Sequence, residues 1–295
     1  MIKGGLFGYS GSGKTTLFRK LTGKQEEIYD PFTPNPGIGR YEDERLRKIK
    51  EILQPRKIIF PELEFIDLKG FPEGEGFPPQ FFKNLYDVDI IICVVKNFGD
   101  GVNPEEEAGS LIMELLFHDI DKLEKIKMIR EKEGKKENLH IIEKAIDFLK
   151  NDKFLKDMEE IDKKQLSGIE LLTTKEVIIY LNGKNKNVDL KYPVVSDQDN
   201  IYEKIIKQLS MITFYTIKGD IAQSWIIKKD IPAKKAAGKI HKDIEKGFIK
   251  AAVLHWKDFI EIGDWKKAKN MGVVKFLGPN SFISDGDIVE FYFSK

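Results

Sequence analysis

The sequence predicts an α/β protein whose first part is a doubly wound, mostly parallel sheet. Strand-like and helix-like segments alternate there, and the strand expected at Val88–Val95 is apolar throughout from Ile90 onward, as a strand covered on both faces requires. After Pro104 comes a long Lys/Glu-rich stretch without proline, and short strands separated by turns follow from about Met211. We therefore expect an α/β domain (1–103 and 167–210), an inserted helical coiled-coil hairpin (104–166) and a small α+β domain (211–295).

The composition excludes several classes of protein. The 295 residues carry a formal net charge of +1, which gives no overall signal for nucleic acid. We find no signal peptide and no apolar stretch of membrane-spanning length. We expect a cytoplasmic monomer with no membrane or DNA partner. The single cysteine, Cys93, lies inside an apolar run and is expected to be a buried structural thiol.

The elements of the α/β domain follow from local patterns. Ile2–Gly8 is an apolar strand, and Thr15–Lys24 is a helix with an apolar side. Tyr29–Gly39 contains three prolines and two glycines and is expected to be a loop. The other expected elements are helices at 42–53, 80–86 and 200–210 and strands at 57–61, 63–67, 88–95, 176–181 and 192–195.

The later segments have their own patterns. Two apolar stripes at helical spacing predict the hairpin, with Gly134 at its tip. Its charges are solvated helix faces or, alternatively, a surface for a partner. In the last domain we expect strands at 212–217, 224–227, 250–254 and 288–293 and a helix at 233–243.

Gly8–Thr15 matches the phosphate-binding P-loop, G-x-x-x-x-G-K-[ST], with a strand before it and a helix after it. Its glycines let backbone N–H groups face a phosphate, and the helix adds its positive dipole end. Lys14 is expected to reach the β/γ-phosphates and Thr15 to ligate Mg²⁺. The alternative is a Gly/Ser turn that binds nothing. The expected nucleotide contacts here are Ser10, Gly11, Ser12, Gly13, Lys14, Thr15 and Thr16.

Asp67–Gly70 reads D-x-x-G at the end of the second strand after the P-loop. In P-loop switch proteins this Asp holds the Mg²⁺ shell and the Gly N–H contacts the γ-phosphate. Thr33 is the natural second Mg²⁺ hydroxyl, or else an ordinary turn threonine. Phe71 stands where many GTPases place a water-orienting Gln, and a phenyl ring cannot orient water. We assign Lys14, Gly70 and Phe71 to the catalytic step.

A base-reading loop is expected after the strand that ends near Leu181. Asn182-Gly-Lys184-Asn185 lies at the place of an N-K-x-D loop, with Lys in the third position and an amide in the fourth, where guanine needs a carboxylate. An Asn can instead match the donor–acceptor edge of adenine. A polar turn is the alternative. Ser196, after the last strand of the sheet, would belong to the final base loop.

With these residues assigned, the chain resembles the YchF/Obg-like ATPase family, P-loop proteins of the translation-factor class. The distinctive segments are Asp30–Gly39, Leu63–Gly70, Glu73–Gly76, Ala236–Ala251 and His255–Gly263. The resemblance implies a G domain, an inserted coiled coil and a C-terminal ubiquitin-like β-grasp (TGS) domain. It also implies a hydrophobic residue in place of the Gln, ATP hydrolysis in preference to GTP, and association with ribosomes.

Two residues depart from the family pattern. Gly11 stands where the family usually has an Asn linked to activation by monovalent cations, so potassium dependence does not carry over. Asn185 breaks the usual N-x-x-E base loop, so the choice between ATP and GTP stays open. The loop after Gly70 and the link after Ser196 are also shorter than the family's.

Three functions remain open. They are a slow ATPase switch associated with ribosomes, a GTP-specific GTPase, and a nucleotide- and RNA-binding module that does not hydrolyse. Residues 213–295 hold 15 lysines, no arginine and 10 acidic residues, a net charge of +5. This suits contact with ribosome or rRNA phosphates, although ordinary surface lysines explain it too. The expected contacts, along one helical stripe, are Lys235, Lys239, Lys242 and Lys246.

Overall fold

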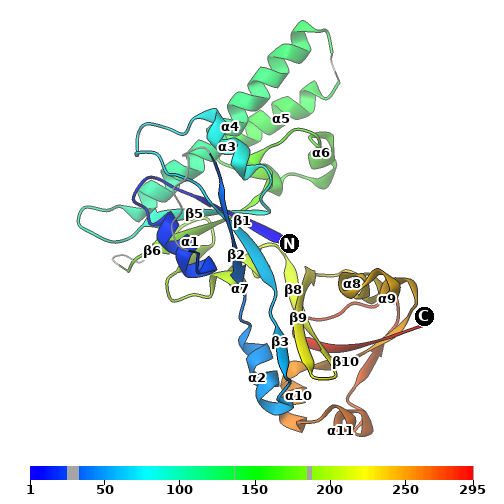
Figure 1. Cartoon of the computed structure of the whole chain (residues 1–295). Helices are drawn as coiled ribbons and strands as arrows, with labels where there is room; N and C mark the ends of the chain where they lie inside the picture. The colour runs from blue at the N-terminus through cyan, green and yellow to red at the C-terminus, as the bar shows by residue number, and fades with distance from the viewer. Residues whose placement is uncertain (25–32, 136, 185–187, 295) are drawn as a thin grey trace. The chain divides into compact units, whose positions relative to one another are not determined.

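The computed structural model describes residues 1–24, 33–135, 137–184 and 188–294. They form two compact units (Figure 1). Unit 1 comprises Met1–Gly39 and Leu63–Ile201, and unit 2 comprises Arg40–Glu62 and Tyr202–Lys295. The predicted domain bounds place residues 40–62 and 202–210 with the α/β domain, whereas in the structure they belong to the second compact unit.

Unit 1 is built on a six-stranded sheet of order β2-β4-β1-β5-β6-β7. Its central strand β1 pairs in parallel with β4 and β5, and β6 pairs in parallel with β5 and β7. The predicted parallel α/β fold is therefore confirmed. The carboxyl ends of these strands lie at one edge, where the candidate site residues follow them. The strands are β1 (Ile2–Phe7), β2 (Asn35–Arg40), β4 (Glu62–Asp67), β5 (Ile90–Lys96), β6 (Glu176–Asn182) and β7 (Val194–Ser196).

Strand β2 corrects the expectation of a loop over 29–39 for residues 35–39, while residues 29–32 lie outside the described part of the chain. Its sequence, Asn-Pro-Gly-Ile-Gly-Arg, has poor strand propensity, but it lies at the edge of the sheet, where Pro36 needs no ladder partner. A side chain at Gly37 would come within 2.6 Å of the Phe18 ring. Packing against the first helix therefore explains a glycine in a strand, and local propensity could not predict it.

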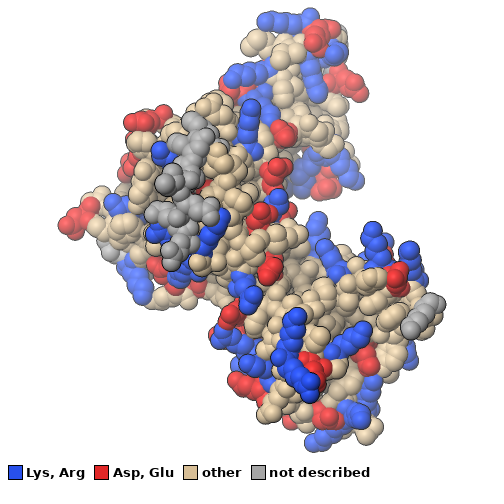
Figure 2. Space-filling view, viewed as in Figure 1, with Lys and Arg blue, Asp and Glu red and all other residues tan. Residues whose placement is uncertain are grey.

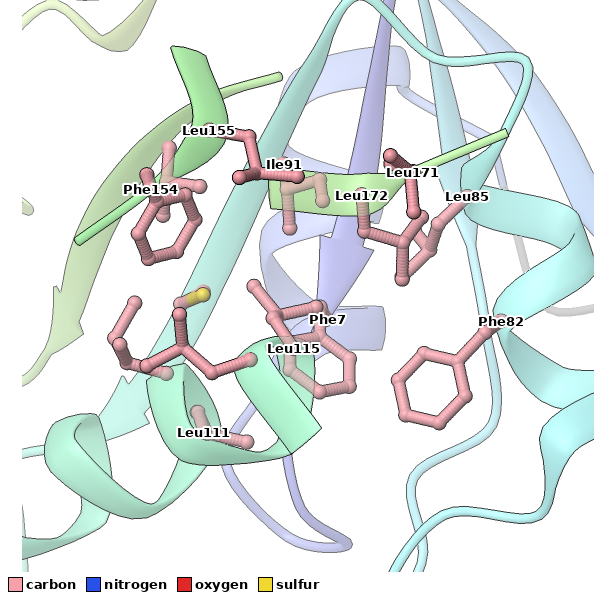
Figure 3. Packing of buried hydrophobic residues seen from close by; sticks show 14 of the residues in the cluster. Phe7, Phe82, Leu85, Ile91, Leu111, Leu115, Phe154, Leu155, Leu171 and Leu172 are labelled. Carbon is pink, nitrogen blue, oxygen red and sulfur yellow. The ribbon is translucent and has the colours of Figure 1, made fainter. Parts of the chain in front are cut away.

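The main core of unit 1 covers one face of this sheet. Figure 3 shows Phe7 and Ile91 of the sheet facing Leu111 and Leu115 of α4, with Leu172 close by. Cys93 of β5 is fully buried, as predicted, and burial raises the pKa of its thiol. The helices of unit 1 are α1 (Lys14–Thr22), α3 (Pro79–Phe82), α4 (Pro104–Lys132), α5 (Leu139–Lys150) and α6 (Glu160–Gln165), with short 3₁₀ turns at 83–85, 155–157 and 172–174.

The inserted hairpin is formed by α4 and α5, which lie side by side (Figure 1). The turn between them begins at Gly134, whose φ of +69° lies in the left-handed region that favours glycine. Asp119 fixes α4 to the 3₁₀ turn before β6, because its buried carboxylate accepts from the N–H groups of Leu172 and Thr173 at 3.1 and 2.8 Å. No helix in the described part of the chain combines the length and apolar character needed to cross a membrane.

Unit 2 contains a six-stranded mixed sheet of order β11-β10-β12-β8-β9-β3. The hairpin β8–β9 is antiparallel, β12 lies parallel to β8, and β10 pairs antiparallel with both β12 and β11. The assignment of this unit as a TGS domain stays a prediction. Its strands are β3 (Lys57–Ile59), β8 (Met211–Lys218), β9 (Ile221–Lys228), β10 (Phe248–His255), β11 (Lys275–Leu277) and β12 (Asp287–Phe293), and its helices are α2 (Glu44–Leu53), α7 (Ile201–Gln208), α8 (Ala233–Ile240), α9 (Lys242–Lys246), α10 (Trp256–Ile262) and α11 (Trp265–Asn270).

The predicted single helix over 233–243 is wrong, because the first helix ends at Ile240 and a second one begins at Lys242. His241 is extended, with φ −161° and ψ 142°, and its side chain caps the next helix by accepting from Asp243 N–H. The four lysines therefore lie on two short helices and do not form one helical stripe. Lys235 pairs with Glu245 at 2.7 Å, across the break.

Residues 40–62 join unit 2 through a strand and a buried polar network. Strand β3 pairs in parallel with β9, and the apolar side of α2 enters the core of the unit. Asp43 is 1% exposed and accepts from the Arg45 guanidinium at 2.8 Å and the Tyr215 hydroxyl at 2.7 Å. Arg45 also donates to Asp285 at 2.7 Å. The network fixes the start of α2 beside β8.

Replacing Asp43 by Ala should lower the free energy of unfolding by about 3 kcal/mol, because the buried Tyr215 hydroxyl loses its acceptor and the half-buried Arg45 guanidinium keeps only the exposed Asp285. The matched control is Asp285→Ala, which removes the second carboxylate on Arg45, where the side chain is 52% exposed. We expect about 1 kcal/mol for the control. Urea unfolding of both variants measures the difference, and equal losses would contradict the assigned role of Asp43.

Candidate functional site

A pocket of about 380 Å³ lies at the carboxyl edge of the unit 1 sheet. Its walls come from the P-loop, from the loop that follows β4 and from the ends of β5 and β6. The lining residues are Ser10, Gly11, Gly13, Lys14, Thr15, Thr16, Leu68, Lys69, Gly70, Phe98 and Asn182. The predicted phosphate loop, D-x-x-G loop and base loop therefore meet in one place.

Lys14 is the cation of this pocket. Its side chain is 5% exposed and donates to the Tyr9 carbonyl at 2.7 Å. Burial lowers the pKa of Lys14 to about 8, and the negative charges of Asp67 and Glu107 oppose that shift. A bound anion would stabilise the charged form further, so Lys14 suits a phosphate contact.

Thr15 and Asp67 form the oxygen pair that a metal would need. The Thr15 hydroxyl donates to Asp67 Oδ2 at 2.9 Å, and Asp67 is fully buried. Mg²⁺ prefers oxygen ligands, and one hydroxyl beside one carboxylate matches that preference. These two residues therefore fit a magnesium site, although no cluster of three or more His, Cys, Asp or Glu suited to a metal occurs among the described residues.

The D-x-x-G loop lies directly on the P-loop. The Ser10 N–H donates to the Phe71 carbonyl at 2.8 Å. A Cβ atom at Gly70 would lie 2.6 Å from Ser10 N and would also clash with the Lys14 ammonium. Only glycine allows this approach, so the position of Gly70 in the motif has a steric reason.

Asn182 supports the P-loop from the base-loop side. Its amide nitrogen donates to the Ser12 carbonyl at 2.9 Å. Gly13 has φ +97°, and a side chain there would clash with the Asn182 amide. The first residue of the predicted base loop is therefore placed against the phosphate loop, at the rim of the pocket.

Several predicted residues lie elsewhere. Ser12 is buried beneath the loop, and Ser196 donates to Asp199 at 2.8 Å. Thr33 and Lys184 are exposed and are not among the residues that line the pocket. Asn185 lies outside the described residues.

The Phe71 ring does not line the pocket, although it was assigned to the catalytic step. It packs edge-on against Phe77 and Phe81, both at 5.7 Å between ring centroids. Its backbone carbonyl accepts from the Ser10 N–H of the P-loop. The ring anchors the loop to the core, which a residue with a polar head could not do at the same low cost.

Three pocket residues were not predicted, namely Leu68, Lys69 and Phe98. Phe98 follows the end of β5, is 39% exposed, and has the Lys96 ammonium 5.2 Å from its ring centroid. Its place after the carboxyl end of a central strand is the signal that could have identified it. Lys69 and Leu68 lie inside the D-x-x-G motif itself.

Two known protein families match this chain, and the first match covers all the residues that line the pocket. A family described as a 50S ribosome-binding GTPase matches residues 3–183. A family named for the C-terminal part of YchF GTPases, and described as a protein of unknown function, matches residues 211–294.

Comparison with individual proteins extends the likeness over the whole chain. The chain is 28% identical to the ribosome-binding ATPase YchF of Mycoplasma genitalium, over 100% of each chain. It is 26% identical to that of Bacillus subtilis, over 99% of each. The YchF GTPase of Schizosaccharomyces pombe superimposes with a TM-score of 0.81 at 22% identity, over 99% of this chain and 97% of that one. A GTP-binding protein from Pyrococcus horikoshii OT3 gives 0.55 at 16% identity, over 99% and 100%.

Lys14→Ala should abolish nucleotide turnover and weaken nucleotide binding by about 10- to 100-fold, since one buried charge-assisted contact is worth about 1.5–3 kcal/mol. Lys20→Ala is the matched control, because Lys20 lies on the same helix, is exposed and pairs with Asp197 at 3.0 Å. Phosphate release by the purified variants is the measurement. Unchanged turnover in Lys14→Ala would exclude this pocket as the hydrolytic site.

Proposed function

Because this chain belongs to the YchF family, we propose that it is a slow, Mg²⁺-dependent nucleotide hydrolase that acts as a ribosome-associated switch in the cytoplasm. The observation that carries the proposal is the convergence of Lys14, Thr15 and Asp67 in one pocket at the carboxyl edge of the sheet. The relatives are named ribosome-binding ATPases, and the family that matches residues 3–183 is described as a GTPase.

The residues of the pocket have different roles in binding the nucleotide. The Lys14 ammonium binds and neutralises phosphate oxygens, and the P-loop N–H groups together with the start of α1 hold the anion. Thr15 and Asp67 are the residues that would hold Mg²⁺, which would supply positive charge to offset that of the phosphates. Gly70 lies so close to Lys14 that a Cβ atom there would clash with the ammonium, and its N–H is the expected donor to the γ-phosphate.

The attacking water must be oriented without a side chain at position 71, because the Phe71 ring is held in the core. Orientation of the attacking water then depends on backbone groups, the metal or another residue, and a poorly oriented nucleophile reacts slowly. We therefore expect slow turnover. The same observation favours the second candidate, a module that binds nucleotide and RNA without hydrolysis, and the Lys14→Ala comparison separates the two.

ATP should bind at least as well as GTP. The reason is chemical: Asn185 lacks the carboxylate that would accept two hydrogen bonds from guanine, and an amide matches adenine instead. Thermal shift with ATP, GTP and their non-hydrolysable analogues measures the preference, because bound ligand stabilises the fold by about 2.7 kcal/mol at a hundredfold excess over Kd.

Asn185→Asp should shift this preference toward GTP, while Asn187→Asp adds the same charge two residues away and should not. A wild-type protein that binds GTP tenfold tighter than ATP, about 1.4 kcal/mol, would contradict the prediction and support the alternative of a GTP-specific GTPase.

The proposed ribosome or rRNA contact is the lysine-bearing surface of α8 and α9. Lys235, Lys239, Lys242 and Lys246 are all exposed there. In the view of Figure 2, Lys and Arg side chains are spread over unit 2 with acidic side chains among them, so the basic character is distributed. Lys235 is partly neutralised by Glu245. A contact of this kind would be non-specific and salt-sensitive.

Changing these four lysines to Glu should reduce co-sedimentation with ribosomes steeply and leave nucleotide turnover of the isolated protein intact. The matched control changes Lys257, Lys266, Lys267 and Lys275, which are exposed elsewhere on unit 2, to Glu. A salt series accompanies both variants. Equal loss in both would show that charge alone matters, and normal pelleting of the first would shift the contact to the hairpin at 104–166.

A further inference from the structure

Glu107 is a buried carboxylate close to the nucleotide pocket that the proposed chemistry does not use. It lies in the first turn of α4, is 9% exposed, and its Oε2 accepts from the Lys96 N–H at the end of β5 at 3.1 Å. Among the residues that the structure describes, it forms no ion pair. A glutamine could accept the same hydrogen bond, so the hydrogen bond alone does not explain a charge at this position.

Four titratable groups from three elements surround Glu107. Lys14 of the P-loop and Lys96 of β5 act on it as positive charges, and Glu73 of the loop after Gly70 acts as a negative one. Tyr9, whose carbonyl accepts from Lys14, is the fourth group that interacts with it. Glu107 therefore interacts electrostatically both with Lys14, the phosphate-binding lysine, and with the loop after Gly70.

Burial dominates this balance. It raises the pKa of Glu107 to about 7, while the Lys96 N–H, Lys14 and Lys96 oppose the shift and Glu73 adds to it. Folding stability depends on pH through this shift. A carboxyl whose pKa is raised on folding binds protons more tightly in the folded protein, so its contribution to stability is greatest at low pH and falls as pH rises from about 4.5 to about 7.

We propose that Glu107 is a positioning residue of the nucleotide site that takes up one proton from solvent when the nucleotide phosphates bind at Lys14. The inference rests on the nucleotide binding proposed above. The bound phosphates add negative charge beside Lys14 and cancel its support for the ionised carboxylate. The buffer acid then gives its proton to the Glu107 oxygen that does not accept from Lys96, leaving the neutral acid and the conjugate buffer base.

The consequence is a nucleotide site whose affinity depends on pH through a residue outside the pocket. A neutral Glu107 no longer attracts the Lys14 ammonium, so this carboxyl no longer competes with the phosphates for the lysine. The hydrogen bond from Lys96 keeps the start of α4 in place in both protonation states, because a carboxyl group in either state can accept it.

The test is calorimetric titration of the full chain at pH 7.0 with a non-hydrolysable ATP analogue and Mg²⁺. Titrations in buffers of different ionisation enthalpy give the number of protons taken up. We expect about half a proton for the wild type, because a group with a pKa near 7 is half ionised there. Lys14, with a pKa of about 8, is already mostly protonated at this pH and contributes little.

Glu107→Gln should bind the analogue without this uptake and should unfold no earlier than the wild type, since its amide oxygen can still accept from Lys96. The matched control is Glu105→Gln, an exposed residue of the same turn, which should behave as the wild type. As a second measurement, wild-type Kd should rise about threefold between pH 6.5 and 7.5, and that of Glu107→Gln should change less.

Equal proton uptake by wild type and Glu107→Gln would overturn the inference while leaving nucleotide binding intact. A wild-type affinity that is flat between pH 6 and 8 would overturn it without any variant. Absence of binding heat in the wild type would overturn the proposed function and this inference together.

Discussion

The close approach of the loop after β4 to the P-loop is the constraint on which the rest of the site depends. Ser10 and Phe71 are joined backbone to backbone at 2.8 Å, and there is no room for a side chain at Gly70. The Phe71 ring, held between aromatic neighbours, fixes the far side of that loop. This packing brings Asp67 within 2.9 Å of Thr15. The hydrophobic residue after the D-x-x-G motif thus holds the loop in place. It cannot supply the water-orienting amide that many GTPases have at this position.

Burial sets the electrostatics of the same region. Lys14 and Asp67 are nearly inaccessible, and taking such charges out of water is costly unless they compensate each other. The pKa of Lys14 falls only to about 8 because Asp67 and Glu107 offset part of its desolvation. The carboxylates therefore keep the lysine charged near neutral pH, which a phosphate contact requires. The Glu107 carboxyl in turn responds to the charge of Lys14, so the titrations of these two groups are coupled.

Local signals predicted the parts of the site that local chemistry defines. The P-loop, the D-x-x-G motif and the turn at Gly134 are short patterns with fixed backbone needs. The missed features depend on long-range packing. Strand β2 exists because Phe18 and the sheet edge accept a Pro-Gly sequence, and the helix over 233–243 breaks because His241 caps the next turn. The hydrogen bond from Asn182 to Ser12 joins residues far apart in sequence, so no window of sequence contains it.

The path of the chain through residues 40–62 was the least predictable feature, and it bears directly on the site. The chain leaves unit 1 after β2 and returns at β4, whose last residue is Asp67. In between, β3 joins the second sheet and Asp43 fixes α2 through Arg45 and Tyr215. Hydrophobic periodicity identified the helix and the strand but could not say which core they enter, because both cores accept the same residue types. Asp67, the carboxylate proposed to hold the metal, is the last residue of β4. The segment that leads into β4, Arg40–Glu62, belongs to unit 2.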